Sequence, residues 1–290
     1  RVFRAMREVE GVTQVVALKV LRHGLASGSA RAQFDRERRA LARVVHPAIA
    51  SFIDAGISAD GEAWIALEFI DGVSLVEHAR MNALGSRERV RLMVDVAHAV
   101  GAAHRSLVVH RDLKPANILV DRQGRIKLLD FGIAKLIEAP SSDDGTTQTQ
   151  TQFRAFTPAY AAPEQRAGGL ITTATDVYSL GVVLTELLTG QRRSGSASAT
   201  PAESEPAAGD AVPPAAVARA LPRPWRADLD NILGKACAAE PELRYESAGA
   251  FADDLQRLLA GEPVGAHPPS RVYRLRKFVA RNRLAVGSAS

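Results

Sequence analysis

A polar segment enclosed by apolar residues constrains this chain more than any other feature of its sequence. The segment reads HRDLKPAN at positions 110–117, with LVV before it and ILV after it. Short apolar runs of this kind are typical of buried backbone, where polar side chains are stable only when hydrogen bonds or a bound group satisfy them. We therefore expect positions 110–117 to lie in the interior and to bind something.

Composition narrows the class of protein. The 290 residues are 46% hydrophobic and 24% charged, which is ordinary for a soluble globular protein. The length is sufficient for one large domain or for two lobes with a sizeable core. A single cysteine, Cys237, excludes an intramolecular disulfide and indicates a reducing compartment.

The net charge of +5 comes from the C-terminal end of the chain. Positions 271–290 hold six basic residues and no acidic residue, and without them the net charge would be −1. Basic charge confined to one tail does not form a nucleic-acid-binding face, so we expect no nucleic-acid partner. The six residues are Arg271, Arg274, Arg276, Lys277, Arg281 and Arg283.

The periodicity of apolar residues predicts a strand-rich beginning and a helical remainder. Up to position 70 we expect one helix, at 29–45, with an apolar side made of Phe34, Leu41, Val44 and Val45. Around it, strands are expected at 15–21, 49–56 and 62–70. From about position 74 the pattern becomes helical, with helices predicted at 86–106, 173–190, 228–238 and 247–261. Between 191 and 224 the chain is mainly Ala, Pro, Ser and Gly, which predicts a mobile loop or linker.

Further motifs come after the opening segment in a fixed order. DFG stands at 130–132, thirteen residues after Asn117, and APE stands at 162–164. VALK, which ends at Lys19, lies on a predicted strand, and Glu37 lies in the helix after it. Together with HRDLKPAN, this set of motifs resembles the protein kinases. The sequences of these segments are similar to those of bacterial serine/threonine kinases.

The resemblance implies an α+β, two-lobed fold with a small β-rich N-lobe and a larger helical C-lobe. We expect the N-lobe at 1–70, the C-lobe at 71–262 with an insert around 191–224, and a basic, juxtamembrane-like tail at 263–290. No G-x-G-x-x-G precedes Lys19, and RVFRA at the start resembles the residues that come directly after those glycines in the family. The first strand and the Gly-rich loop are therefore expected to be missing from this sequence.

The resemblance also assigns chemical roles. Asp112 would accept the proton of the substrate hydroxyl, and Lys114 would contact the transferred phosphoryl group of ATP. Asn117 and Asp130 would bind Mg²⁺, which prefers oxygen ligands. Lys19 would contact the α- and β-phosphates and would be oriented by an ion pair with Glu37.

Other positions are assigned to support, to adenine binding and to regulation. His110 and Asp176 would hold the catalytic loop, and Arg244 would pair with the Glu of APE. Arg111 would bind a phosphate added to the segment that ends at APE, which gives an enzyme switched by autophosphorylation. The adenine site would comprise Ala17, Leu67, Glu68, Ile70 and Leu119. The regulatory threonines would be Thr146, Thr147, Thr149 and Thr151, with Thr157 contacting the catalytic residues.

Two other functions share parts of this pattern. A small-molecule phosphotransferase would use the same loop chemistry but generally lacks APE and the long segment before it. A pseudokinase or scaffold would explain the missing Gly-rich loop, although every other catalytic position is intact. The main expectation is a serine/threonine protein kinase that uses ATP and Mg²⁺ and acts on protein substrates.

The tail allows two interpretations. Residues Val272, Leu275, Phe278 and Val279 recur at helical spacing among the basic residues. The segment could be a solvated, frayed terminus, or a helix attracted to anionic lipids. On the second interpretation the protein is cytoplasmic and lies on the cytoplasmic face of the inner membrane, with a membrane-spanning segment coming next in the gene. The sequence predicts no particular oligomeric state.

Overall fold

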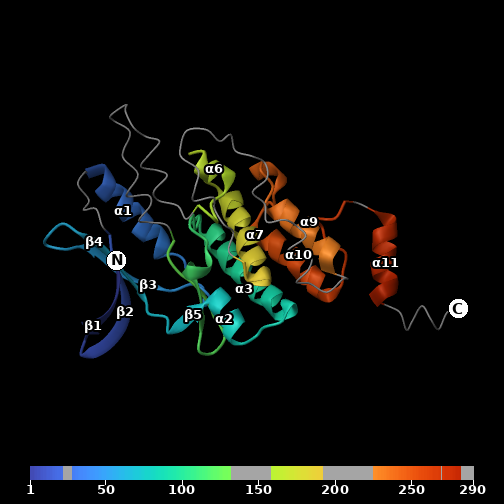
Figure 1. Ribbon diagram of the computed structural model, residues 1–290. Coiled ribbons are helices and arrows are strands. Elements are labelled where there is room, and N and C mark those ends of the chain that lie inside the picture. Colours follow the sequence, from blue (N-terminus) through green and yellow to red (C-terminus); the bar gives the residue numbers. More distant parts are fainter. Residues whose placement is uncertain (22–27, 132–157, 192–224, 269, 282–290) are drawn as a thin grey trace.

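The computed structural model describes residues 1–21, 28–131, 158–191, 225–268 and 270–281, which form two lobes (Figure 1). The N-lobe is a four-stranded antiparallel sheet, ordered β1-β2-β4-β3, together with helix α1. The two-lobed α+β fold predicted from the sequence is confirmed. The N-lobe elements are β1 (Val2–Val9), β2 (Val12–Val20), α1 (Gly28–Leu41), β3 (Phe52–Ile57) and β4 (Ala63–Glu68).

Strands β1 and β2 form a hairpin with a two-residue turn. Glu10 and Gly11 both have positive φ angles, 50° and 81°, as the turn that best matches the twist of a hairpin requires. The turn fixes the register that pairs Val9 with Val12 and Arg4 with Ala17. Since side chains alternate along a strand and paired residues share a face, this register also settles which residues of β1 lie on the same face as Lys19.

Helix α1 contributes the core of the N-lobe. Phe34 and Leu41 are buried and belong to the same hydrophobic core as Ile65 of β4. Val44 is buried as predicted, but Val45 is 91% exposed, so its assignment to the apolar side was wrong. The reason is that α1 ends at Leu41, and the helical period no longer determines the direction of a side chain four residues later.

The C-lobe is built around helix α7 (Thr173–Thr189), which runs beside α3 (Ser86–Arg105) and α10 (Ala248–Ala260) (Figure 1). Buried residues lie on all sides of α7, as in a helix enclosed by others. Gly190 ends it with a φ angle of 68°, as predicted, because glycine adopts this left-handed conformation without a steric penalty. The other α-helices among the described residues are α2 (Leu75–Met81), α6 (Pro163–Arg166), α9 (Arg226–Ala236) and α11 (Arg271–Arg281).

A second, three-stranded sheet lies where the lobes meet. Leu128 donates its amide hydrogen to Ala48 O (2.8 Å) and accepts one from Ala50 N (3.0 Å), which joins the C-lobe to the segment before β3. Asp130, two residues on, is thereby placed at the boundary between the lobes. The strands of this sheet are β5 (Gly72–Ser74), β6 (Ile118–Asp121) and β7 (Ile126–Leu128).

Two observations concern the predicted linker and the search for membrane-spanning helices. The loop or linker predicted at 191–224 lies, apart from Gln191, outside the described residues. Within the described part of the chain, none of the helices combines the length and the apolar character needed to cross a bilayer.

Candidate active site

A buried carboxylate on α7 holds the polar segment in place. Asp176 is 1% exposed, and one of its oxygens accepts hydrogen bonds from His110 N (2.7 Å) and His104 Nε2 (2.8 Å). The other oxygen accepts from Arg111 N (2.9 Å). Several donors compensate the cost of burying this group. The prediction that Asp176 anchors the loop through its backbone is confirmed.

His110 supports the loop from inside the core. Its side chain is fully buried, its ring lies 4.9 Å from that of Phe131, and Nε2 donates to Leu129 O (2.7 Å). Nδ1 accepts a hydrogen bond from Asp112 N (3.3 Å), so the hydrogen of the neutral ring is on Nε2. Burial lowers the pKa of His110, which favours this neutral form. Both nitrogens of the imidazole are therefore used in hydrogen bonds that support the loop, the structural role predicted for this position.

Asp112 lies at the centre of a cluster formed by residues two and five positions further on. Lys114 Nζ is 2.8 Å from Asp112 Oδ2, and Asn117 Nδ2 donates to Asp112 O (2.8 Å) and more weakly to Oδ2 (3.2 Å). The short 3-10 helix η1 (Pro115–Asn117) turns the chain so that Asn117 reaches back. The sequence thus places a carboxylate, an ammonium and an amide together, and the carboxylate remains partly accessible, with a side-chain exposure of 15%.

The second cluster joins the two lobes. Lys19 Nζ on β2 is 2.6 Å from Asp130 Oδ1 after β7, and both side chains are partly buried. The expected ion pair between Lys19 and Glu37 is not formed between these two described residues, and on this point the prediction was wrong. Asp130 has a φ angle of 56°, a left-handed conformation that aspartate tolerates better than most residues. The ammonium therefore has a near counter-ion in Asp130 and does not bind a carboxylate on α1.

Asn117 and Asp130 have side chains that fit a magnesium ion. Leu129 N donates to Asn117 O (2.8 Å), which ties the segment of Asp130 to that of Asn117. The amide nitrogen of Asn117 is used by Asp112, so the side-chain oxygen of Asn117 is available as a ligand. Amide and carboxylate oxygens are the hard ligands that Mg²⁺ prefers, and the ion would neutralise phosphate charge. Asn117 and Asp130 would hold it.

Comparison with known proteins decides the family. The family model described as the protein kinase domain matches residues 1–248. The chain belongs to the protein kinase family. Curated relatives include the serine/threonine-protein kinases PknB of Mycobacterium tuberculosis (36% identical) and pkn3 of Myxococcus xanthus (37% identical). The alignments cover 87% and 88% of this chain but 40% and 47% of those proteins, so the chain spans less than half of their length.

A solved structure supports the same assignment. The crystal structure of the PknI kinase domain of M. tuberculosis, determined for a mutant of that protein, has a TM-score of 0.63 and is 28% identical. The match covers 87% of this chain and 88% of that chain. Both the sequence and the fold are thus similar to bacterial serine/threonine kinases over most of the chain.

The residues predicted to bind adenine lie on both sides of the boundary between the lobes. Ala17 and Leu67 are paired on adjacent strands, and Ile70 lies just past the end of β4. Leu119 belongs to β6 in the C-lobe sheet. Their side chains are half-buried, which suits the walls of a site open to a ligand.

Glu68 has a partner in the kinase domain that the sequence analysis missed. Its carboxylate accepts from Lys127 Nζ (2.7 and 3.0 Å) and from Ser51 N (3.1 Å). Burial alone would raise the pKa of Glu68, but these hydrogen bonds outweigh it and lower the pKa. Lys127 is one of only six lysines in the chain, and that rarity was the signal available in the sequence. The pair fixes the link between the lobes.

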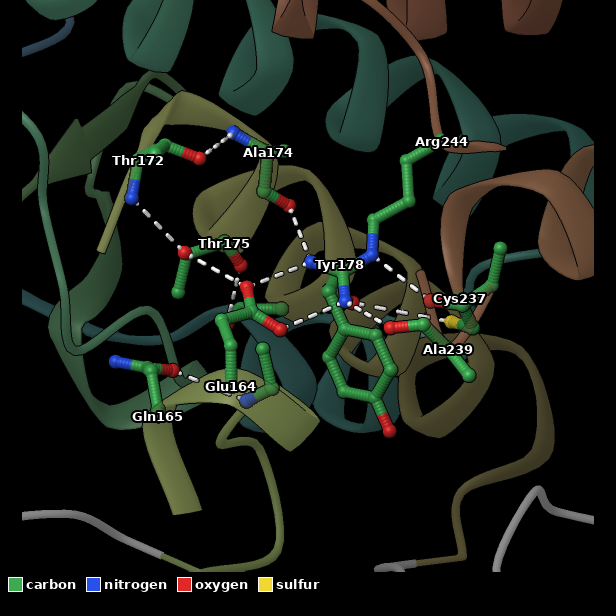
Figure 2. Close-up of polar contacts among 12 residues, drawn as sticks. Glu164, Gln165, Thr172, Ala174, Thr175, Tyr178, Cys237, Ala239 and Arg244 are labelled. Carbon is green, nitrogen blue, oxygen red and sulfur yellow. Dashed lines mark hydrogen bonds and ion pairs between the residues drawn. The ribbon is translucent and has the colours of Figure 1, made fainter. Parts of the chain in front are cut away.

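The Glu of APE forms a buried ion pair, shown in Figure 2. Arg244 binds both oxygens of Glu164 at 2.7 and 2.8 Å, and Thr175 Oγ1 donates to the same carboxylate (2.8 Å). The guanidinium is fully buried, lies over the ring of Tyr178 at 5.0 Å, and donates to three backbone carbonyls. The predicted pairing of Arg244 with Glu164 is confirmed, and it anchors the segment after the regulatory region to the C-lobe.

The regulatory threonines Thr146, Thr147, Thr149, Thr151 and Thr157 lie outside the described residues. Arg111, their predicted partner, is described. Its backbone is held by Asp176, and its φ angle is 67°. Its Nε and Nη1 atoms are buried and have no hydrogen-bond partner in the described part of the chain.

Proposed function

We propose that this kinase domain transfers the γ-phosphoryl group of ATP to serine and threonine hydroxyls of proteins. One observation carries the proposal: the Asp112 carboxylate is held beside the Lys114 ammonium at 2.8 Å, within the loop that also presents Asn117. A base for the hydroxyl and a cation for the transferred group are what phosphoryl transfer requires, because it needs positioning and charge neutralisation more than covalent chemistry. The names of the relatives support serine and threonine as acceptors.

The residues would divide the reaction between them. Asp112 accepts the hydrogen bond and then the proton of the attacking hydroxyl, and Lys114 stabilises the charge on the transferred phosphoryl group. Asn117 and Asp130 hold Mg²⁺. Lys19, which binds Asp130 in this structure, turns to the α- and β-phosphates when the nucleotide occupies the cleft.

We also propose that the enzyme phosphorylates its own segment before APE. Arg111 supports this, because burying guanidinium atoms without acceptors is costly and a phosphate group supplies acceptors together with opposite charge. Phosphate on that segment would order it against the catalytic loop.

Incubation with γ-labelled ATP and Mg²⁺ tests the function and the switch together. We expect label on the protein, and mass spectrometry should place it on one or more of Thr146, Thr147, Thr149 and Thr151. Chelation of Mg²⁺ should abolish labelling. Arg111→Gln should reduce the gain in activity that phosphorylation produces, because the phosphate then lacks its cation. Phosphate found solely outside positions 141–157 would contradict the switch.

We further propose that the protein is cytoplasmic and that α11 rests on an anionic membrane face. Tyr273 Oη donates to Asp228 Oδ1 on α9 (2.8 Å), and Lys277 forms an ion pair with the same carboxylate. These contacts anchor one side of α11, which argues against a frayed terminus. On the helix, Val272, Leu275 and Val279 are 75%, 63% and 40% exposed. An apolar stripe flanked by basic residues is typical of helices that lie in the interface of a membrane.

Vesicle co-sedimentation tests the membrane proposal. The protein, and a peptide of residues 270–290, should bind vesicles containing phosphatidylserine and dissociate in high salt, because screening removes the attraction. Arg274→Gln should weaken binding about fivefold, since one cation near such a surface contributes roughly 1 kcal/mol. Arg122→Gln, an exposed change on the β6–β7 hairpin, serves as the matched control. Equal binding to neutral and anionic vesicles, or none at low salt, would contradict the proposal.

A further inference from the structure

Gln165, the residue after APE, connects two parts of the active site. It is 4% exposed. Its Oε1 accepts a hydrogen bond from Ala162 N (3.0 Å), and its Nε2 donates to Arg111 O (3.0 Å). In Figure 2 the amide nitrogen of Gln165 points away from the Glu164–Arg244 cluster. The first hydrogen bond is an ordinary helix cap for α6, but the second reaches a residue 54 positions earlier and needs another explanation.

The group that receives the second hydrogen bond is the peptide immediately before Asp112. Arg111 has a φ angle of 67°, a conformation that costs a non-glycine residue about 1 kcal/mol or more unless its surroundings enforce it. Asp176 binds the amide of Arg111, and Gln165 binds its carbonyl. The backbone that leads into Asp112 is therefore held from both sides, by α7 and by α6.

The other end of Gln165 is part of an equally rigid segment. Tyr160 O accepts from Ser179 Oγ (3.0 Å), and Tyr160 Oη donates to Glu186 Oε2 (2.5 Å), both on α7. Tyr160, Ala161 and Ala162 are all buried. Residues of this segment and of the catalytic loop line one small pocket of about 10 Å³, among them Asp112, Tyr160, Ala161 and Gln165. A displacement of one segment would therefore reach the other through the Gln165 amide.

We propose that Gln165 is a positioning residue that sets the orientation of the Asp112 carboxylate by holding the Arg111 carbonyl. The proposal rests on the proposed function, because it assumes that Asp112 is the catalytic carboxylate. It makes the geometry of the base depend on the placement of residues 160–162. If residues 160–162 are displaced, the hydrogen bond from Gln165 to the Arg111 carbonyl is lost. The Arg111 backbone can then leave its left-handed conformation.

Two substitutions of similar size test the proposal. Gln165→Met removes both hydrogen bonds, and kcat should fall about 10- to 100-fold, the effect expected from misplacing a catalytic group by about 1 Å. KM for ATP should stay within about twofold, because Lys19 and Asp130 are held elsewhere. Gln165→Glu keeps the acceptor for Ala162 N but turns a carboxylate oxygen toward the Arg111 carbonyl. Its activity relative to the parent should rise as the pH falls from 8 to 5.5, because protonation restores a donor.

Hydrogen exchange provides a readout that does not require activity. Exchange in a peptide spanning 108–114 should be at least about tenfold faster in Gln165→Met than in the parent, while exchange in α10 stays unchanged. Gln123→Met, on the exposed turn before β7, is the matched control and should leave both measurements unaffected. If Gln165→Met fails to fold, the relative pH profile of Gln165→Glu and its exchange pattern decide the question.

The outcomes separate this proposal from the proposed function. If the parent transfers phosphate, Asp112→Asn does not, and Gln165→Met retains parental kcat, then Gln165 is only a helix cap and the proposal is wrong. If the parent itself transfers no phosphate, the proposed function fails, and unchanged exchange at 108–114 in Gln165→Met would overturn the role of Gln165 independently. A relative activity of Gln165→Glu that does not depend on pH also contradicts it.

Discussion

Replacing Asp112 with Asn should lower the rate of phosphoryl transfer about 100- to 10,000-fold, the range that general-base catalysis contributes. The amide cannot take the proton of the attacking hydroxyl, and Lys114 loses the carboxylate that lies 2.8 Å from its ammonium. The hydrogen bond from Asn117 to the backbone carbonyl of residue 112 is retained, so the loop keeps its shape. Single-turnover measurements at saturating ATP report this loss directly.

Affinity for ATP and the melting temperature should change little in Asp112→Asn. The groups expected to bind the nucleotide, Lys19 and Asp130, form a separate cluster, and asparagine has nearly the same size and shape as aspartate. Asp71→Asn, which removes an exposed carboxylate paired with Arg122, is the matched control. If Asp112→Asn retains more than about a tenth of the parent rate, Asp112 is not the base. Equal background rates in parent and variant would favour the scaffold interpretation.

Removal of the buried Arg244 guanidinium should strongly destabilise the C-lobe. In Arg244→Met the free energy of unfolding should fall by about 3–5 kcal/mol, because the Glu164 carboxylate would stay buried without its counter-ion. Three backbone carbonyls would also lose their donor. Urea denaturation measures the loss, and the exposed pair of Arg80 and Glu77 supplies a control, since Arg80→Met should barely move the transition.

The double variant Arg244→Met, Glu164→Gln separates the pair from its surroundings. It should be more stable than Arg244→Met alone, because no charge is left buried. If it is the less stable of the two, the destabilisation comes from lost packing and from backbone carbonyls left without a donor, and the unpaired carboxylate is not its cause. This outcome would contradict our account of Arg244→Met.

The pH dependence of the same pair has a definite sign. Burial alone would raise the pKa of Glu164, but hydrogen bonds from Arg244 and Thr175 outweigh it and lower the pKa below its ordinary value of 4.5. A carboxyl whose folded pKa is lowered stabilises the protein above its unfolded pKa and loses that contribution as the pH falls through the folded value. The stability difference between parent and Arg244→Met should therefore narrow below about pH 4.5. A difference that is constant with pH would contradict the assigned cause.

Much of this molecule could be predicted from local sequence. Helices α3 and α7 are predicted by the spacing of their apolar residues. Gly190 marks the end of α7 because few other residues adopt its φ angle. The cluster of Asp112, Lys114 and Asn117 is nearly a local property, since one short turn brings residues five positions apart into contact. The supporting roles of His110 and Asp176, and the pairing of Arg244 with Glu164, were available from resemblance.

Tertiary structure alone decided the pairings between distant residues. Lys19 binds Asp130 and leaves Glu37 aside, and Glu68 binds Lys127 across the lobes. Gln165 reaches Arg111, and Asp228 anchors α11 through Tyr273 and Lys277. A spacing rule describes neighbours along one helix or strand, whereas these contacts join residues from 45 to 111 positions apart. Hydrogen bonds and close ion pairs act over about 3 Å, so the packing of whole elements determines which of several chemically suitable partners is near enough to bind.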